Sequence, residues 1–360
     1  MTKRILPLAI LVALIGIVGL TVSVGAQQAP AAQLFKAYPV QGNIYMLQEP
    51  GGANVVVSLG QSGVMLIDSG SAQLADRMLA SVKQLATDVL SRAVPFQPCV
   101  GQNCAAYRYP WGWTGNSFDG VTASVAPPHP IRYILNTSTH PDHTGGNAKI
   151  GAAGVTYVGG NITGTIADPG AGAAIVSHEN VLHEMTAAKA VDAALPTETY
   201  AAPFYKLTWF FNGEGVQLFH PQTAYSDGDS IVYFRYSDVI ATGEIYNTVS
   251  YPVIDTAHGG TINGVIDALS QILDIAFPEF RSEGGTVIIP GRGRLSDVAD
   301  VANYRNMVYI IRDRIRDAKQ KGRTLDQVKA AKPTMDYDGH YSKAPQTADQ
   351  FVTAVYNTVK

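Results

Sequence analysis

Cysteine and an excess of charge of either sign are what this sequence has little of. It contains two cysteines in 360 residues, and its 26 basic side chains are nearly balanced by 29 acidic ones. Proteins that bind nucleic acid gather lysine and arginine into a stripe or patch, and no such stripe is present. Nucleic acid is therefore not an expected partner, and a small-molecule substrate or ligand is the better expectation.

Long apolar runs are also rare, and the one that exists lies at the N-terminus. Two basic residues precede an apolar stretch from residue 5 to about residue 24, and small residues follow it up to Ala26. This pattern is typical of an export signal, so we expect cleavage after Ala26 and a periplasmic or secreted protein. The alternative is an uncleaved anchor through residues 5–24, because the run approaches the roughly 20 residues that span a bilayer. No other membrane contact is expected.

The two cysteines, Cys99 and Cys104, are five positions apart in a stretch rich in proline, glycine and aromatic residues. In an exported protein this spacing favours a local disulfide. Two cysteines without a nearby histidine would make a poor zinc site. The surrounding segment, 91–128, is long for a connection and is expected to be an insertion. Its aromatic side chains either contact a ligand beside the site or pack over the core as a lid.

The most informative segment is NTSTHPDHTGGN, residues 136–147. It follows Ile131–Leu135, an apolar run that predicts a short buried strand. His140, Asp142 and His143 then lie within four residues, and such a cluster at the end of a strand is typical of a site for a metal such as zinc. The alternative is a polar loop in which the aspartate caps the next helix.

This segment resembles the metal-binding loop of the metallo-β-lactamase superfamily, whose pattern is H-x-H-x-D-H, usually followed by T-G-G-N. The resemblance extends, in the same order and spacing, over about residues 36 to 300. It includes the first hairpin with its aspartate–glycine turn and the segments that carry the later metal ligands, at residues 53–57, 64–70, 227–234, 242–244 and 289–293. It implies a four-layer αββα sandwich with the site at one edge. A loop at residues 251–260 resembles one found in an exported branch of the superfamily.

The sequence departs from the family pattern at most of the ligand positions. Three positions where histidine is expected hold Ser138, Tyr225 and Arg292, and Glu244 replaces an aspartate. The ligands that remain are His140, Asp142, His143 and Glu244. By this resemblance one metal site keeps a single imidazole and is lost. The other could hold at most one zinc ion, with an open position for water.

Arg292 favours a different interpretation of the same residues. A guanidinium is always charged and cannot be a metal ligand. We expect it to donate charge-assisted hydrogen bonds to Asp142 and Glu244, replacing a zinc ion electrostatically. The alternative is a solvated arginine on the surface.

Other histidines and the remaining elements complete the predictions. His220 and His258 are the two best placed to restore a metal site, although a strand end and a turn are their simpler roles, while His178 is expected to be structural. A strand is expected at residues 154–158. Helical spacing of apolar residues predicts helices over 74–90, 262–276, 299–331 and 351–359. The expected domains are the family-like domain, residues 33–300, and a C-terminal helical extension, residues 301–360.

Two functions follow from the resemblance. The first is a metal-dependent hydrolase with at most one metal, in which Asp142, Tyr225 and Arg292 assist catalysis on an ester, lactam, thioester, phosphoester or sulfoester. The second is a metal-free pseudoenzyme that binds a small molecule or a partner. The changes at Ser138, Tyr225, Glu244 and Arg292 favour the second. The fold itself does not choose a substrate.

Overall fold

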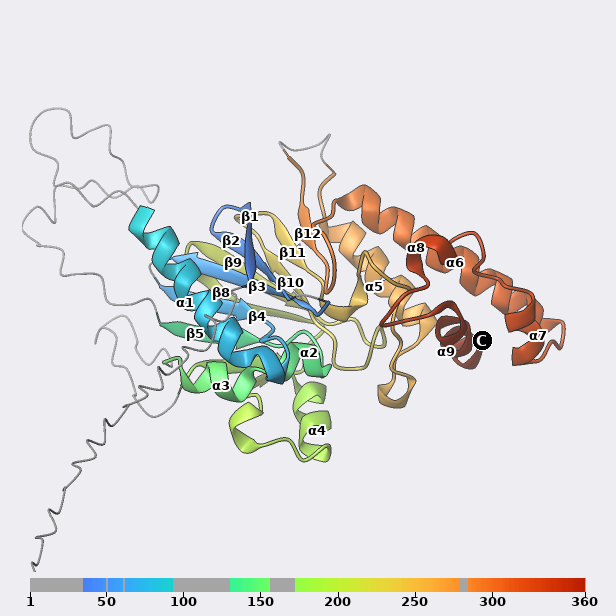
Figure 1. Ribbon diagram of the computed structural model, residues 1–360, viewed down its shortest axis with the longest axis horizontal. Coiled ribbons are helices and arrows are strands. Elements are labelled where there is room, and N and C mark those ends of the chain that lie inside the picture. The colour runs from blue at the N-terminus through green and yellow to red at the C-terminus, as the bar shows by residue number, and fades with distance from the viewer. Residues whose placement is uncertain are drawn as a thin grey trace, which may run out of the picture. The chain divides into compact units, whose positions relative to one another are not determined.

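Two β-sheets form the centre of the computed structural model (Figure 1). The structure describes residues 35–49, 51–60, 62–92, 130–155, 172–278 and 284–359. The expected export signal, most of the expected insertion and both cysteines lie outside these residues, as does most of the strand expected at 154–158. Those predictions remain predictions. Among the described residues, no helix is long and apolar enough to cross a membrane.

The first sheet has seven strands, in the order β1 to β7. From β1 to β4 each strand runs antiparallel to the next, and from β4 to β7 each strand runs parallel to the next. Its strands are β1 (Lys36–Gln41), β2 (Ile44–Gln48), β3 (Asn54–Gly60), β4 (Gly63–Ile67), β5 (Ile131–Leu135), β6 (Ala174–His178) and β7 (Glu198–Tyr200). The strand predicted at residues 131–135 is confirmed with the same bounds.

The second sheet has five strands, in the order β12-β11-β10-β9-β8. They are β8 (Phe204–Phe211), β9 (Glu214–Phe219), β10 (Ile231–Phe234), β11 (Val239–Ala241) and β12 (Val287–Ile289). All pairs are antiparallel except β11 with β12, which run parallel.

Alternation of side chains along the strands explains why the sheets stack with helices outside. In β3, Val55 and Val57 join one core cluster, whereas Val56 joins another that also contains Val232 and Phe234 of the second sheet. Successive side chains of a strand point to opposite faces, so a fully apolar strand must be covered on both. The face with Val56 meets the second sheet, and the face with Val55 and Val57 meets helices.

The helices form the two outer layers. α1 (Ala75–Arg92) and α3 (Asn147–Ala152) cover the first sheet. α5 (Ile262–Ile275), α6 (Val298–Gln320) and α9 (Ala348–Thr358) share one apolar cluster with the second sheet. The predicted four-layer αββα sandwich is therefore confirmed. The remaining helices are α2 (Pro141–Thr144), α4 (Glu179–Ala187), α7 (Leu325–Ala330) and α8 (Asp338–Tyr341).

The helical pattern predicted over residues 299–331 is divided into two helices, α6 and α7. Gly322 has a φ of 76°, a left-handed conformation that ends the first helix. Thr324 and Gln327 then form a capping box that begins the second. The apolar residues whose helical spacing marked this segment are buried in α6, at Tyr304, Met307, Val308, Ile311 and Ile315.

Strand direction brings the polar segments to one edge of the sandwich. Asp68 follows β4 and Asn136 follows β5, and these two strands are parallel. Glu244 follows β11 and Arg292 follows β12, which are also parallel. The carboxyl ends of parallel strands meet at the same edge, so four segments far apart in sequence lie together there.

Candidate functional site

The HPDH segment forms the short helix α2, and its first residue caps it. His140 Nδ1 accepts a hydrogen bond from the Asp142 backbone N–H at 3.2 Å, and Pro141 occupies the first helical position. A proline there is favourable because its missing N–H would have no partner inside the helix. In this short helix the His143 side chain points inward and is fully buried. The Asp142 side chain lies on the outer face of the helix and is partly exposed.

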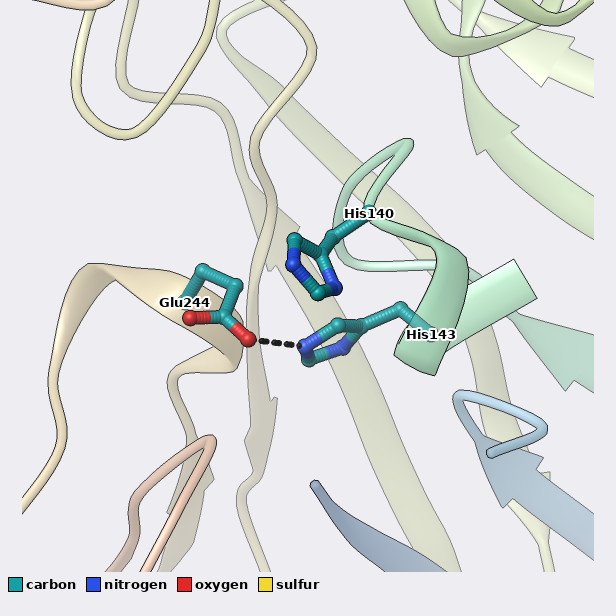
Figure 2. Close-up of side chains that lie close together, drawn as sticks. All are labelled: His140, His143 and Glu244. Atoms are coloured by element: carbon teal, nitrogen blue, oxygen red, sulfur yellow. Dashed lines mark hydrogen bonds and ion pairs between the residues drawn. The ribbon is translucent and has the colours of Figure 1, made fainter. Parts of the chain in front are cut away.

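His143 lies between two carboxylates. Its Nδ1 is 2.5 Å from Asp68 Oδ2 and its Nε2 is 2.9 Å from Glu244 Oε1, and Figure 2 shows the second contact. Burial lowers the pKa of His143, but the charges and hydrogen bonds of Asp68 and Glu244 outweigh it and raise the pKa to about 10. At neutral pH His143 is therefore an imidazolium that donates from both ring nitrogens.

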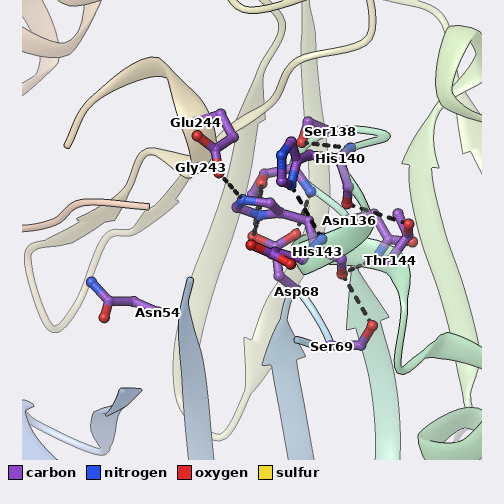
Figure 3. A network of polar contacts seen from close by, with 12 residues as sticks. Asn54, Asp68, Ser69, Asn136, Ser138, His140, His143, Thr144, Gly243 and Glu244 are labelled. Carbon is purple, nitrogen blue, oxygen red and sulfur yellow. Dashed lines mark hydrogen bonds and ion pairs between the residues drawn. The ribbon is translucent and has the colours of Figure 1, made fainter. Parts of the chain in front are cut away.

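Asp68 holds this arrangement from the end of β4. Its Oδ1 accepts from the Thr137 backbone N–H and its Oδ2 from the Thr137 hydroxyl, both at 2.7 Å. Its φ of 65° is unusual for a residue with a side chain, and such strain persists only where surrounding contacts hold it. Figure 3 shows Asp68 below the His143 ring. The sequence placed Asp68 in the first hairpin but did not predict this role.

Arg292 reaches the same site from the loop after β12. Its Nη2 donates to Asp142 Oδ2 at 2.7 Å and to Glu244 Oε1 at 2.9 Å. Both hydrogen bonds predicted for Arg292 are confirmed. The residue is 5% exposed, so the alternative of a solvated surface arginine is wrong. Burial lowers the pKa of Arg292, but Glu244 and Asp142 more than offset this effect and raise it.

Glu244 is the centre of the network. Its Oε1 accepts from both His143 and Arg292, and the residue is 2% exposed. Burial raises the pKa of a carboxyl group, but here the two cationic neighbours hold the pKa of Glu244 well below its usual range. The backbone also meets closely here, because a Cβ on Gly291 would lie 2.3 Å from the Gly243 carbonyl oxygen. Glycine at 291 thus allows the Arg292 loop to approach Glu244.

The substituted positions lie beside His140. The Tyr225 ring is 5.9 Å from the His140 ring between centroids, and Ser138 Oγ accepts from the His140 backbone N–H at 3.3 Å. Burial raises the pKa of Tyr225 above its ordinary value, so its hydroxyl stays protonated. Two of the three substituted positions, Ser138 and Tyr225, therefore lie next to His140.

Comparison with solved structures identifies the fold. The chain is similar to a double mutant of the sec-alkyl sulfatase PisA1, with a TM-score of 0.56, 14% identity, and coverage of 90% of this chain and 50% of the sulfatase chain. The chain has the metallo-β-lactamase fold. It is also similar to the DIM-1 metallo-β-lactamase, with a TM-score of 0.48, 12% identity, and coverage of 77% of this chain and 98% of that one.

A metallo-β-lactamase from Pontibacter korlensis gives a TM-score of 0.48 at 12% identity, covering 76% of this chain and 99% of that one. No protein-family model matches the sequence. A comparison with curated proteins also found no match. At these identities the similarity shows the fold, and function has to be argued from the site.

Three side chains of this metallo-β-lactamase-fold protein are close enough to hold one metal ion. Ligand atoms of His140, His143 and Glu244 lie within 4.8 Å of one another. Asp142 is not in this group, since it pairs with Arg292. The sequence predicted all four as ligands, and the structure brings three of them together.

The chemistry of these donors fits a metal poorly. A metal ligand must offer a lone pair, whereas His143 uses both nitrogens to donate to carboxylates. Glu244 Oε1 already receives two donors, and the Arg292 cation lies 2.9 Å from that oxygen. A divalent ion there would have to displace the His143 proton and lie beside a fixed positive charge. Of the two imidazoles in the group, His140 has a pKa that is lowered, chiefly because of burial, and so stays neutral.

The two other candidate histidines have structural partners. The rings of His220 and His178 are stacked at 3.6 Å between centroids, and His220 Nδ1 is 2.8 Å from the Asp229 carbonyl oxygen. His178 caps α4 by accepting from the Asn180 N–H. His258 is bonded to Asp255 in an exposed turn. Neither His220 nor His258 belongs to the group that could hold a metal among the described residues.

Proposed function

We propose that this chain is a metal-free protein on a hydrolase fold, in which a buried ion network replaces the metal centre. The observation that carries the proposal is the position of Arg292, which bonds Asp142 and Glu244 through one nitrogen. The protein then binds a small molecule or a partner at this edge and does not perform metal-dependent hydrolysis.

The charges support this proposal because two buried cations offset most of the negative charge of three carboxylates. Arg292 and the His143 imidazolium supply two positive charges, and they face the carboxylates of Asp68, Asp142 and Glu244. A buried carboxylate without a partner is strongly destabilising, so a site that loses its metal needs another cation. Arg292 and the second proton of His143 provide that charge without a metal.

The outer side of the network is where a ligand would bind. The Asp142 side chain is 29% exposed, and His140 is partly exposed beside it. A carboxylate and a neutral imidazole together favour a ligand that donates hydrogen bonds. Arg292, His143 and Glu244 are buried behind them and would orient Asp142 without contacting the ligand.

A hydrolase with one metal is the second candidate. It is favoured by the grouping of His140, His143 and Glu244 within 4.8 Å. Bound zinc would acidify a water molecule and polarise a scissile bond. This function requires the His143 proton to leave and Arg292 to move away from Glu244.

Turnover measurements with and without zinc separate the two functions. We would test an ester, a lactam, a thioester, a phosphodiester and a secondary alkyl sulfate, the last because one similar structure is a sec-alkyl sulfatase. The proposal predicts no zinc-dependent turnover of any of them. Hydrolysis that requires zinc and is lost in Glu244→Ala would establish the second candidate instead.

Ligand binding is then sought in chelator, by a fragment screen followed by NMR. The proposal predicts ligands whose affinity falls at least several-fold in Asp142→Ala. The matched control is Asp300→Ala, which removes a carboxylate paired with an arginine outside the site. Ligands that bind both variants equally would show that they occupy a different surface.

A further inference from the structure

Helix α4 is attached to the site by few apolar contacts and several polar ones. Along its nine residues the buried side chains are Val181 and Met185. The side chain of Asn180 donates to the Asp227 carbonyl oxygen at 2.7 Å. Glu184 Oε2 accepts from the Thr139 hydroxyl at 2.5 Å. Thr139 directly precedes His140, so Glu184 links the helix to the site loop.

Glu184 also meets a second carboxyl group, that of Asp227. Asp227 raises the pKa of Glu184 through its negative charge and a side-chain contact, so the two carboxyl groups lie close together. Glu184 Oε1 and Asp227 Oδ1 are both buried, and among the described residues neither receives a hydrogen bond from an N–H or O–H of another group. Two ionised carboxylates have no proton to place between them and repel each other. A close pair of this kind therefore shares one proton.

We propose that the proton shared by Glu184 and Asp227 latches α4 to the loop that carries His140, and that losing this proton releases the helix. The latch joins three segments: α4, the Asp227 turn and the Thr139 loop. Gly228 shows how closely the turn packs on the helix, since a Cβ there would lie 3.0 Å from a methyl group of Val181. This inference is independent of whether the site holds a metal.

The charged groups around the pair set the direction of the effect. Burial raises the pKa of Glu184 to about 7, while the hydrogen bond from Thr139 opposes it. On the neighbouring turn, a hydrogen bond to Asp255 raises the pKa of His258, and the positive charge of protonated His258 lowers the pKa of Glu184. Two further titratable groups around the pair, Glu179 and His183, belong to α4. Two others, Tyr225 and His140, belong to the candidate site and are neutral.

The sign follows from linkage. The pKa of Glu184 is about 7 in the latched state and near 4.5 when the helix is released to water. The released state therefore binds the proton less well. The latch is strongest below about pH 4.5 and is lost as the pH rises through about 7.

Hydrogen exchange of the full-length protein tests the latch, with the amides of residues 179–187 followed at pH 5.5 and pH 8. After correction for the intrinsic exchange rate, we expect protection of α4 to fall roughly tenfold or more at pH 8. In Glu184→Gln the amide can donate to Asp227 without titrating, so protection should be the same at both pH values. Asp227→Asn should also show equal protection of α4 at both pH values. It takes the place of Glu184→Gln in the test if that variant does not fold.

The control is Glu179→Gln, which removes a carboxylate from the same helix without touching the pair. It should keep the pH dependence of the wild-type protein. Equal protection of wild-type α4 at both pH values would overturn the latch. So would an undiminished pH dependence in Glu184→Gln, or its loss in Glu179→Gln, because either would assign the effect to other groups.

Discussion

Arg292 donates a hydrogen bond to Oε1 of Glu244 at 2.9 Å, and this oxygen also receives the Nε2 proton of His143. One carboxylate oxygen thus joins two cations that come from different strand ends. In a metallo-β-lactamase fold this edge is where metal ligands are expected. Here Arg292 and His143 bind the carboxylates of this edge.

Replacing Arg292 by alanine should destabilise the protein by on the order of 3 kcal/mol, because Glu244 and Asp142 would keep their charges without a partner. Equilibrium unfolding in urea at pH 7 measures this change. The control is Arg294→Ala, whose side chain is 65% exposed and pairs with Asp300. It should cost less than about 1 kcal/mol. Equal losses in the two variants would mean that the Arg292 network adds nothing to stability.

The protonation of His143 should make stability depend on pH. Its pKa is raised from 6.5 to about 10 in the folded protein. The stabilisation is therefore complete below about pH 6.5 and is lost as the pH rises through about 10. NMR of ¹⁵N-labelled imidazole should show both His143 nitrogens protonated at pH 8. In Glu244→Gln the ring should lose its proton at lower pH. A neutral His143 ring at pH 8 in the wild-type protein would contradict the network.

Restoring histidines should restore metal binding. In the double variant Tyr225→His and Arg292→His, the fixed cation is gone and two imidazoles are added beside His140 and His143. Imidazole nitrogens are favoured zinc ligands. We expect this variant to bind zinc in a calorimetric titration, whereas the wild-type protein should give no heat of binding. No binding by the double variant would show that these two positions do not face the site.

A chelator should leave the thermal stability of the wild-type protein unchanged. A metal that binds the folded state adds stability that is lost on removal. Scanning calorimetry with and without chelator, at the same protein concentration, measures this directly. A melting temperature lowered by chelator would reveal a bound ion.

Local elements were predictable from the sequence because local patterns determine them. The apolar run at residues 131–135 became β5 with no change of bounds. The division between α6 and α7 was missed, because apolar spacing continues across Gly322 while its left-handed backbone ends the helix. The layers followed from the resemblance, and the structure explains them, because apolar strands need cover on both faces.

The site was predicted in part. The contacts that were missed join residues that are far apart in the sequence. Arg292 and Asp142 are 150 positions apart, and their pairing followed from charge and from the resemblance. The role of Asp68 was not predicted, although an aspartate directly after an apolar strand was a usable signal. The Glu184–Asp227 pair gave no signal in the sequence. Glu49 was also missed, a buried carboxyl group that accepts from Ser71 and whose pKa is raised by burial.

The most direct test of a metal-free site is elemental analysis of the wild-type protein, purified without added metal and again after dialysis against zinc. The ion network predicts no stoichiometric metal in either preparation, because Arg292 and the His143 protons already pair with the carboxylates. One equivalent of zinc that disappears in Glu244→Ala would contradict it and establish the metal site.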